Sequence, residues 1–426
     1  MSSPATTALR RTRRQRRSIV CAVVETLEKR NLLAQSAWAF PGADGQLLYQ
    51  TTVLGDHIAD FATAGYKGGT VPIPDVPVKL TVSPVAGDDT ATIQAAIDDV
   101  ENDPLDANGF RGAVLLAPGE YQIGTSLNIN ASGVVLRGSG TYQTIIRGTG
   151  TGQRTLINVA GSGSRSTVSS TTHNITDKYV PSGAISFTVD STTNLAPGDK
   201  VMIRREATQS WINALGMNLL EPGTEWAPSG YHIQLDRTIT RIDGNVITID
   251  SPINQAIDRV NYGAGTIYKY TYAGRISNVG VENLGGVSDF DPAITSNFDS
   301  PTTYYADMNH PWRFIRLGTV ENAWVRNTLS QYFGNGNVSV ESNSKWVTVT
   351  DSQCLDPVSI IDSPNRYAFN VDDSSHALFR NLYSRDGRHD YVQGSFVPGP
   401  NVFLDSRADN AHSDSGPHHR YSTTTL

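Results

Sequence analysis

The residue types best suited to chemistry gather near the end of the sequence. The stretches YSRDGRHDYVQGSF and DSRADNAHSDSGPHHRYS contain four of the nine histidines, together with arginines, aspartates and tyrosines. Cleavage of a uronic-acid polymer by β-elimination needs a cation for the sugar carboxylate, a base for the adjacent proton and an acid for the leaving oxygen. Arginine suits the first role, and histidine, which titrates near neutral pH, suits the second. The catalytic candidates for this chemistry are Arg388, His389, His418, His419 and Arg420.

Other side chains in these stretches are candidates for substrate binding, as is the segment MNHPWRF. Aromatic rings stack on the apolar faces of sugars, and arginines bind carboxylates. We therefore predict that a polysaccharide contacts Arg385, Tyr391, Arg407, His412, Trp312 and Arg313. Tyr391 is also a candidate donor of the leaving-group proton.

Four aspartates in the same stretches offer oxygen ligands of the kind that calcium prefers. They are Asp386, Asp390, Asp409 and Asp414. No fixed calcium-loop spacing connects them, and no other cofactor is indicated. Zinc bound by His389 and His418 is an alternative, although adjacent histidines rarely both coordinate one zinc ion.

Two further functions stay open. The segment NVDDSSH places Asp372, Asp373 and His376 close together, and paired carboxylates serve as acid and base in glycoside hydrolysis. Adjacent strand residues point to opposite faces, so only one of the two aspartates would reach a given groove. The other function is non-catalytic, in which the polar C-terminal cluster belongs to a glycan-binding surface protein or adhesin.

A repeat in the second half of the chain could hold these groups together. Short runs of alternating apolar and polar residues place Asn or Asp at one matching position, with intervals of 24 to 44 residues. The aligned residues are Asn283, Asn327, Asp351, Asn381 and Asp405. Such a period, with one strand in each unit, is typical of a β-solenoid, whose units bury their apolar faces by stacking. Asn and Asp suit the tight bend because they adopt the left-handed conformation readily.

The rest of the sequence divides by pattern. Residues 37–87 are rich in Gly and Pro and read as an N-terminal cover. Residues 88–174 begin with a helix at 88–100, whose apolar side chains share one face, followed by the first solenoid strands. Residues 175–260 alternate as hairpins and predict a small antiparallel β insertion. Residues 261–426 hold the remaining strands and end at RYSTTTL without a capping element, which predicts a truncated solenoid.

Composition excludes several classes of protein. The chain has 426 residues, 18% charged side chains, two cysteines and no long apolar run, which excludes a coiled coil, a disulfide scaffold and a transmembrane helix. Residues 1–36 are basic, so the remainder is acidic, and an acidic body disfavours nucleic acid as a partner. The oligomeric state does not follow from the sequence.

The stretch GDDTATIQAAIDDV, with the following GAVLLAPGEYQI and SGVVLRGSG, resembles the pectate-lyase-like superfamily. This resemblance spans roughly residues 85–160 and 265–426. It implies an all-β, right-handed parallel β-helix with an N-terminal capping helix, and a polysaccharide as the ligand. The segment VETLEKRNLLA also resembles the LEPR-xLL motif of exported planctomycete proteins, which implies secretion or a place at the bacterial cell surface.

Overall fold

The computed structural model describes residues 38–44, 47–362, 364–395 and 397–416. Contacts divide the chain into two units, Met1–Tyr49 and Gln50–Leu426. The described part of the first unit is an antiparallel pair, β1 (Ala39–Pro41) with β2 (Leu47–Tyr49). The predicted export motif lies outside the described residues.

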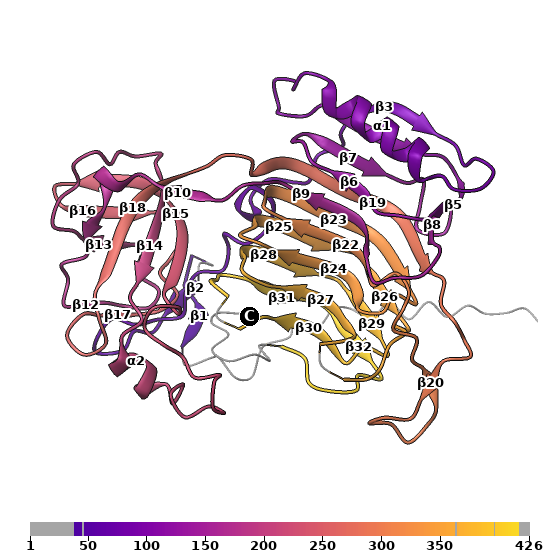
Figure 1. Cartoon of the computed structure of the whole chain (residues 1–426). Coiled ribbons are helices and arrows are strands. Elements are labelled where there is room, and N and C mark those ends of the chain that lie inside the picture. The colour runs from indigo at the N-terminus through magenta and orange to yellow at the C-terminus, as the bar shows by residue number, and fades with distance from the viewer. Residues whose placement is uncertain (1–37, 45–46, 363, 396, 417–426) are drawn as a thin grey trace, which may run out of the picture. The chain divides into compact units, whose positions relative to one another are not determined.

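The second unit contains three rows of parallel strands, and the strands of each row pair in sequence order (Figure 1). The first row of strands is β3 (Val78–Val82), β4 (Gly112–Leu116), β7 (Val134–Arg137), β19 (Ile276–Ser288), β23 (Val320–Gln331), β25 (Lys345–Thr350), β28 (Ser375–Arg380) and β31 (Val402–Leu404). The second row is β6 (Leu127–Ile129), β9 (Thr155–Ala160), β22 (Arg313–Gly318), β24 (Gly336–Glu341), β27 (Tyr367–Val371) and β30 (His389–Gln393). The third row, continuous with long strands β19 and β23, adds β5 (Gly119–Ile123), β8 (Thr144–Gly148), β26 (Gln353–Leu355), β29 (Tyr383–Arg385) and β32 (Arg407–Asp409).

The parallel register builds the core because equivalent residues stack from strand to strand. Val281 pairs with Val325, Val325 with Val349, and Val349 with Phe379, and all four side chains are fully buried in one apolar cluster. A single strand could not bury these side chains alone, so stacking is what removes them from water. The predicted mostly-β class with parallel sheets is confirmed.

The Asn/Asp positions form the row that the repeat predicts. Each one lies at the bend between the first and third rows, and all five have φ between 50° and 58°. The Asn327 Nδ2 atom donates to Asn283 Oδ1 at 2.9 Å, and Asn381 Nδ2 donates to Asp351 Oδ1 at 2.5 Å. The row thus combines a left-handed backbone with amide hydrogen bonds along the stack.

Replacing Asn327 by alanine is expected to lower the free energy of unfolding by about 1–2 kcal/mol. Alanine is strained at a φ of 50°, and it also loses the amide bond to Asn283. Asn327 is exposed, so no core packing is lost. Denaturant unfolding measures the change, and Asn327→Gly should lose less than Asn327→Ala because glycine adopts this φ freely. Equal loss in the two variants would contradict the backbone argument.

Helix α1 (Thr90–Asn102) lies beside β3 at the N-terminal end of the strand stack (Figure 1). Its apolar face enters the parallel-sheet core through Ile93, Ile97 and Val100. The Asp88 carboxylate accepts the Thr90 N–H at 2.8 Å, which satisfies a donor at the start of the helix. The predicted helix is therefore present, and it begins two residues later than 88.

A second sheet is antiparallel and interrupts the parallel strands. Its order is β10 (Arg165–Thr167), β18 (Gly265–Tyr272), β14 (Lys200–Arg205), β15 (Ile233–Asp243), β16 (Val246–Ile249) and β13 (Ser186–Thr188). Val201, Ile203 and Leu235 on one face join a separate apolar core. The predicted hairpin at residues 243–246 is confirmed, since Asp243 pairs with Val246. The sheet extends beyond the predicted 175–260 limits, because the alternating run GTIYKYTY supplies β18.

Short elements complete the described residues. They are η1 (Tyr66–Gly69), η2 (Ser169–Thr171), β11 (His173–Asn174), β12 (Tyr179–Val180), α2 (Gln209–Ala214), β17 (Ile257–Asp258), β20 (Thr295–Ser296) and β21 (Tyr304–Tyr305). In the described part of the chain, no helix combines the length and apolarity needed to cross a membrane.

The predicted cover, 37–87, proves to be partly integral to the parallel sheet. Its last strand, β3, pairs with β4, and Tyr66 packs edge-on against buried Trp324 with ring centroids 5.3 Å apart. The Tyr66 N–H also donates to the Thr348 hydroxyl at 2.8 Å. Residues of this segment therefore bury the outer face of the first row.

Candidate functional site

The predicted catalytic histidine at 389 is part of the interior. His389 and Asp390 belong to β30, a strand in which every residue is buried. The His389 ring packs against Tyr367 at 5.3 Å, and Nδ1 lies 2.6 Å from the Asp414 carbonyl oxygen. A substrate outside the sheet cannot meet this ring, so the prediction that His389 is the base is wrong. The sequence HDYVQ of β30 is polar and therefore does not indicate a buried strand. In the structure it pairs with β27 along its length.

Tyr391 is buried for the same reason and does not line a surface groove. Its ring stacks on Phe369, and its hydroxyl donates to the carbonyl oxygens of Leu382 and Arg407 at 3.1 and 2.6 Å. Burial raises the pKa of the Tyr391 phenol well above its ordinary value. Tyr391 is therefore a structural bridge between strands, and its predicted roles in substrate binding and proton donation are wrong.

The predicted arginines are largely committed to neighbouring carboxylates. Arg385 pairs with Asp356 at 2.7 Å, and Arg407 pairs with Asp409 at 2.8 Å. Arg388 is half-buried in the turn before β30, and His412 is exposed beyond β32. His418, His419 and Arg420 lie outside the described residues. The described members of the predicted Arg/His cluster are therefore not assembled around one cavity.

The predicted calcium ligands do not converge either. Asp390 is buried beside the Ser384 hydroxyl, whereas Asp414 is exposed; Asp386 and Asp409 lie near each other at the ends of β29 and β32. Among residues 38–416, as far as they are described, no three His, Cys, Asp or Glu side chains form a group that could hold a metal ion. Calcium thus stays a prediction.

The two aspartates of the predicted hydrolase pair face different cavities, as the alternation argument requires. Asp372 lines a cavity on the outer face of the second row, whereas Asp373 lines cavities beside the antiparallel sheet. His376 is fully buried, and burial among cations holds the pKa of its imidazole well below the ordinary value. These three residues therefore do not form one catalytic group.

The cavity that Asp372 enters, called the sheet groove here, has a volume of about 430 Å³. Strands β22, β24, β27 and β30 form its floor. The lining residues that matter chemically are Trp312, Arg313, Glu341, Tyr367, Asn370 and Asp372. Trp312 and Arg313 both line this cavity, and their contact with a polysaccharide stays a prediction.

Parallel register places two carboxylates side by side in the sheet groove. Val340 pairs with Val371; the next residue of β24 is Glu341, and the residue directly after β27 is Asp372. Backbones of paired strands are about 4.8 Å apart. Gly394, directly after β30, leaves room for Asp372, since a Cβ atom there would lie 2.3 Å from Asp372 Oδ1. Sequence spacing alone did not reveal the pair, because Glu341 and Asp372 are separated by a long connection.

The two carboxylates have different surroundings. Glu341 is half-buried, and its Oε1 and Oε2 atoms lie 2.8 Å from Arg313 Nη1 and Arg316 Nε. Burial alone would raise the pKa of Glu341, but the two arginines and the Ser339 hydroxyl outweigh it, so the pKa is lowered. Asp372, by contrast, is exposed at the end of β27. Glu341 is therefore ionised within an ion-pair network, whereas Asp372 lies at the solvent-exposed side of the same groove.

The aromatic residue Trp312 directly precedes β22 in the second row of strands. The backbone N–H of Trp312 donates a hydrogen bond to the Arg154 carbonyl oxygen at 2.8 Å, which fixes the position of this residue just before β22. Its half-buried ring fills the space over Gly334, where a Cβ atom would lie 2.1 Å from the indole. The rings of Trp312 and Tyr367 and the two carboxylates therefore line a single cavity, an arrangement suited to holding a sugar.

Comparisons with known proteins found similarity only among solved structures. No protein-family profile and no curated protein matches the sequence. The tailspike gp61 of Pseudomonas phage phi297 is 15% identical to this chain, with a TM-score of 0.44. The tailspike gp49 of Pseudomonas phage LKA1 is 18% identical, with the same TM-score. Each match covers 74% of this chain and 44% of the tailspike. The GH82 iota-carrageenase from A. fortis is 12% identical, with a TM-score of 0.36 over 85% of this chain and 49% of that one. The chain thus spans less than half the length of these proteins.

Proposed function

We propose that the sheet groove is the active site of a polysaccharide-cleaving enzyme, and that the reaction is hydrolysis of a glycosidic bond. The observation that carries this proposal is the alignment of Glu341 with Asp372 on paired strands, next to Trp312. Glycoside hydrolases use two carboxyl groups about 5–9.5 Å apart on either side of the scissile bond. Neighbouring positions on parallel strands are compatible with that separation.

The different surroundings assign the two roles. Glu341, ionised beside Arg313 and Arg316, is the group that attacks the anomeric carbon or activates a water molecule. Asp372 is the acid that protonates the leaving oxygen as the carbon–oxygen bond breaks. A bound sugar would remove Asp372 from water, and such desolvation raises a carboxyl pKa toward the range useful for an acid. Water completes the reaction and leaves a new reducing end.

β-Elimination, the reaction expected from the sequence, is the second candidate. Arg313 and Arg316 supply the positive charge in or beside the groove that a uronate carboxylate requires, although both contact Glu341. Asp372 would then act as the base. Calcium, predicted from the sequence, would add positive charge to the bound uronate if it is used.

The proposal also includes the fold of the protein, its location and its partner. The three parallel rows are consistent with a right-handed β-helix in which α1 covers the first turn of the chain. Because the N-terminal segment resembles an export motif, we infer that the protein acts outside the cell or at its surface. A polysaccharide is the partner expected there.

A screen of neutral and acidic polysaccharides tests the reaction, with added calcium and with a chelator. Hydrolysis produces new reducing ends without the ultraviolet absorbance of unsaturated sugars, whereas β-elimination produces both. Binding without any bond cleavage would contradict both reactions and favour a non-catalytic glycan-binding protein. Loss of activity with the chelator would identify the predicted metal requirement.

A further inference from the structure

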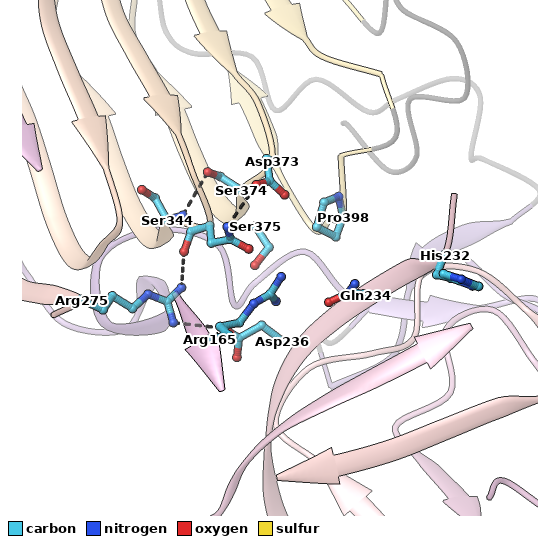
Figure 2. A pocket seen from close by; sticks show the side chains of 11 residues that line it. Arg165, His232, Gln234, Asp236, Arg275, Ser344, Asp373, Ser374, Ser375 and Pro398 are labelled. Carbon is cyan, nitrogen blue, oxygen red and sulfur yellow. Dashed lines mark hydrogen bonds and ion pairs between the residues drawn. The ribbon is translucent and has the colours of Figure 1, made fainter. Parts of the chain in front are cut away.

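We propose that a cavity between the antiparallel sheet and the parallel strands is a second carbohydrate-binding site, which takes an anionic sugar unit on Arg165. Two adjoining cavities, of about 80 and 550 Å³, make up this junction cavity. They share Arg165, Gln234, Asn343 and Asp373. Figure 2 shows Arg165 and Gln234 on one side and Asp373 on the other.

Arg165 is the cation of this site that is available to a ligand. It is half-buried on β10, at the edge of the antiparallel sheet. Its Nη1 atom donates a hydrogen bond to the Met202 sulfur at 3.5 Å, and among the described residues no carboxylate lies within 4.0 Å of its nitrogen atoms. A half-buried guanidinium is stabilised by an anion, so this position favours a negatively charged ligand.

Other cations near the junction are already neutralised. Arg275 pairs with Asp236 at 3.0 Å, and Lys200 pairs with Glu321 at 2.7 Å. These ion pairs hold Arg275 and Lys200 in place and neutralise their positive charge, so that little of it is left to attract an anionic ligand. The contrast marks Arg165 as the group that would recognise an anion.

The remaining lining groups suit sugar hydroxyls. The Asn343 amide donates to Asp373 Oδ2 at 3.1 Å, which orients that carboxylate at the rim. Gln234 adds an amide, and the larger cavity is also lined by the rings of Tyr268 and Tyr272. A volume of about 550 Å³ with amide, carboxylate and aromatic groups exceeds what a simple inorganic anion requires, and fits a sugar unit bearing a carboxylate or sulfate.

This site is distinct from the sheet groove, although the two are neighbours through consecutive residues. Asp372 lines the groove and Asp373 lines the junction cavity. The inference does not require that cleavage takes place in the sheet groove.

Binding measurements on the full chain test the proposal. Arg165→Gln and the parent, both carrying Asp372→Asn, are compared by calorimetry with polygalacturonate, a sulfated galactan and neutral dextran. We expect Arg165→Gln to weaken binding of an acidic polymer about tenfold or more, with dextran unaffected, because a charge-assisted contact is lost. The polymer that shows the loss distinguishes a carboxylate from a sulfate ligand. Arg241→Gln, which alters an exposed arginine of the same sheet paired with Asp243, is the matched control.

Three outcomes would overturn the proposal: no binding of either acidic polymer by the parent, equal affinity in the Arg165 variant, or an equal loss for dextran. Thermal unfolding of each variant detects a change in folding. If Asp372→Asn still cleaves polysaccharide, the proposed catalytic site fails, whereas the comparison at Arg165 stays valid because both proteins carry that substitution.

Discussion

Replacing Asp372 by asparagine is expected to reduce polysaccharide cleavage by about 10²–10⁴-fold, the usual contribution of a positioned acid. Asparagine keeps the size of the side chain but cannot transfer a proton to the leaving oxygen. Asp372 is exposed, so the fold should tolerate the change. The release of reducing ends from the best polymer of the screen measures the rate, and substrate affinity should change far less than turnover.

A matched surface variant separates the chemical effect from a general loss of charge. Asp405→Asn also converts an exposed aspartate to an amide, at a φ of 50° that asparagine adopts readily. Asp405 lies in the Asn/Asp row, away from the sheet groove. The Asp405→Asn variant should therefore cleave polysaccharide at the parental rate. Cleavage by Asp372→Asn within a few-fold of the parent would exclude Asp372 as the acid.

Replacing Asp236 by asparagine is expected to lower the free energy of unfolding by about 3–5 kcal/mol, because it leaves buried cations without their counter-charge. Asp236 on β15 accepts hydrogen bonds from Tyr270 at 2.8 Å, Arg275 at 3.0 Å and Lys345 at 3.1 Å. The side chains of Arg275 and Lys345 are only 5% and 2% exposed. This network joins the antiparallel sheet to strand β25.

Denaturant unfolding of three variants checks the argument. Asp243→Asn removes an exposed carboxylate from the same strand, paired with Arg241, and should change stability by no more than about 0.5 kcal/mol. The double variant Asp236→Asn/Lys345→Met should recover part of the loss, since one uncompensated charge is removed. A loss below about 1 kcal/mol in Asp236→Asn would show that the network contributes little.

The same carboxylate predicts how stability responds to acid. Burial alone would raise the pKa of Asp236, but Lys345, Arg275 and the Tyr270 hydroxyl together lower it below its ordinary value. A group with a lowered folded-state pKa contributes its full stability above its unfolded pKa, about 3.9, and loses it as pH falls toward the folded value. Below about pH 4 the parent should therefore lose stability more steeply with falling pH than Asp236→Asn.

The repeat was predictable because its signal is local. Asn327 lies within β23 and Asp351 directly follows β25, in each case after a run of alternating apolar side chains. The tight bend there requires a residue that tolerates positive φ. The same local rules identified α1 and the β15–β16 hairpin. The limits of the antiparallel sheet were less evident, since β10 is only three residues long.

The candidate site was less predictable because it depends on register. Glu341 meets Asp372 only when β24 is aligned with β27, and a connection with its own short strands separates them. The polarity of His389 and Asp390 also led to a wrong prediction, because polar residues are usually expected in exposed loops. Both residues are buried, and the partners of Asp390 include Ser384 and Ser415. Trp312 and Arg313 were predicted as sugar contacts because rings stack on sugars and arginines bind carboxylates, and both line the sheet groove.

The pairing of β24 with β27 has a consequence for how such a protein could diversify. The separation of Glu341 from Asp372 is set by backbone hydrogen bonds between strands, not by residues 356–366, which join β26 to β27. That connection can therefore lengthen, shorten or change sequence over evolution while the two carboxylates keep their spacing. If the proposed hydrolysis is correct, selectivity for different sugar chains can change in this way while the two carboxylates stay in place.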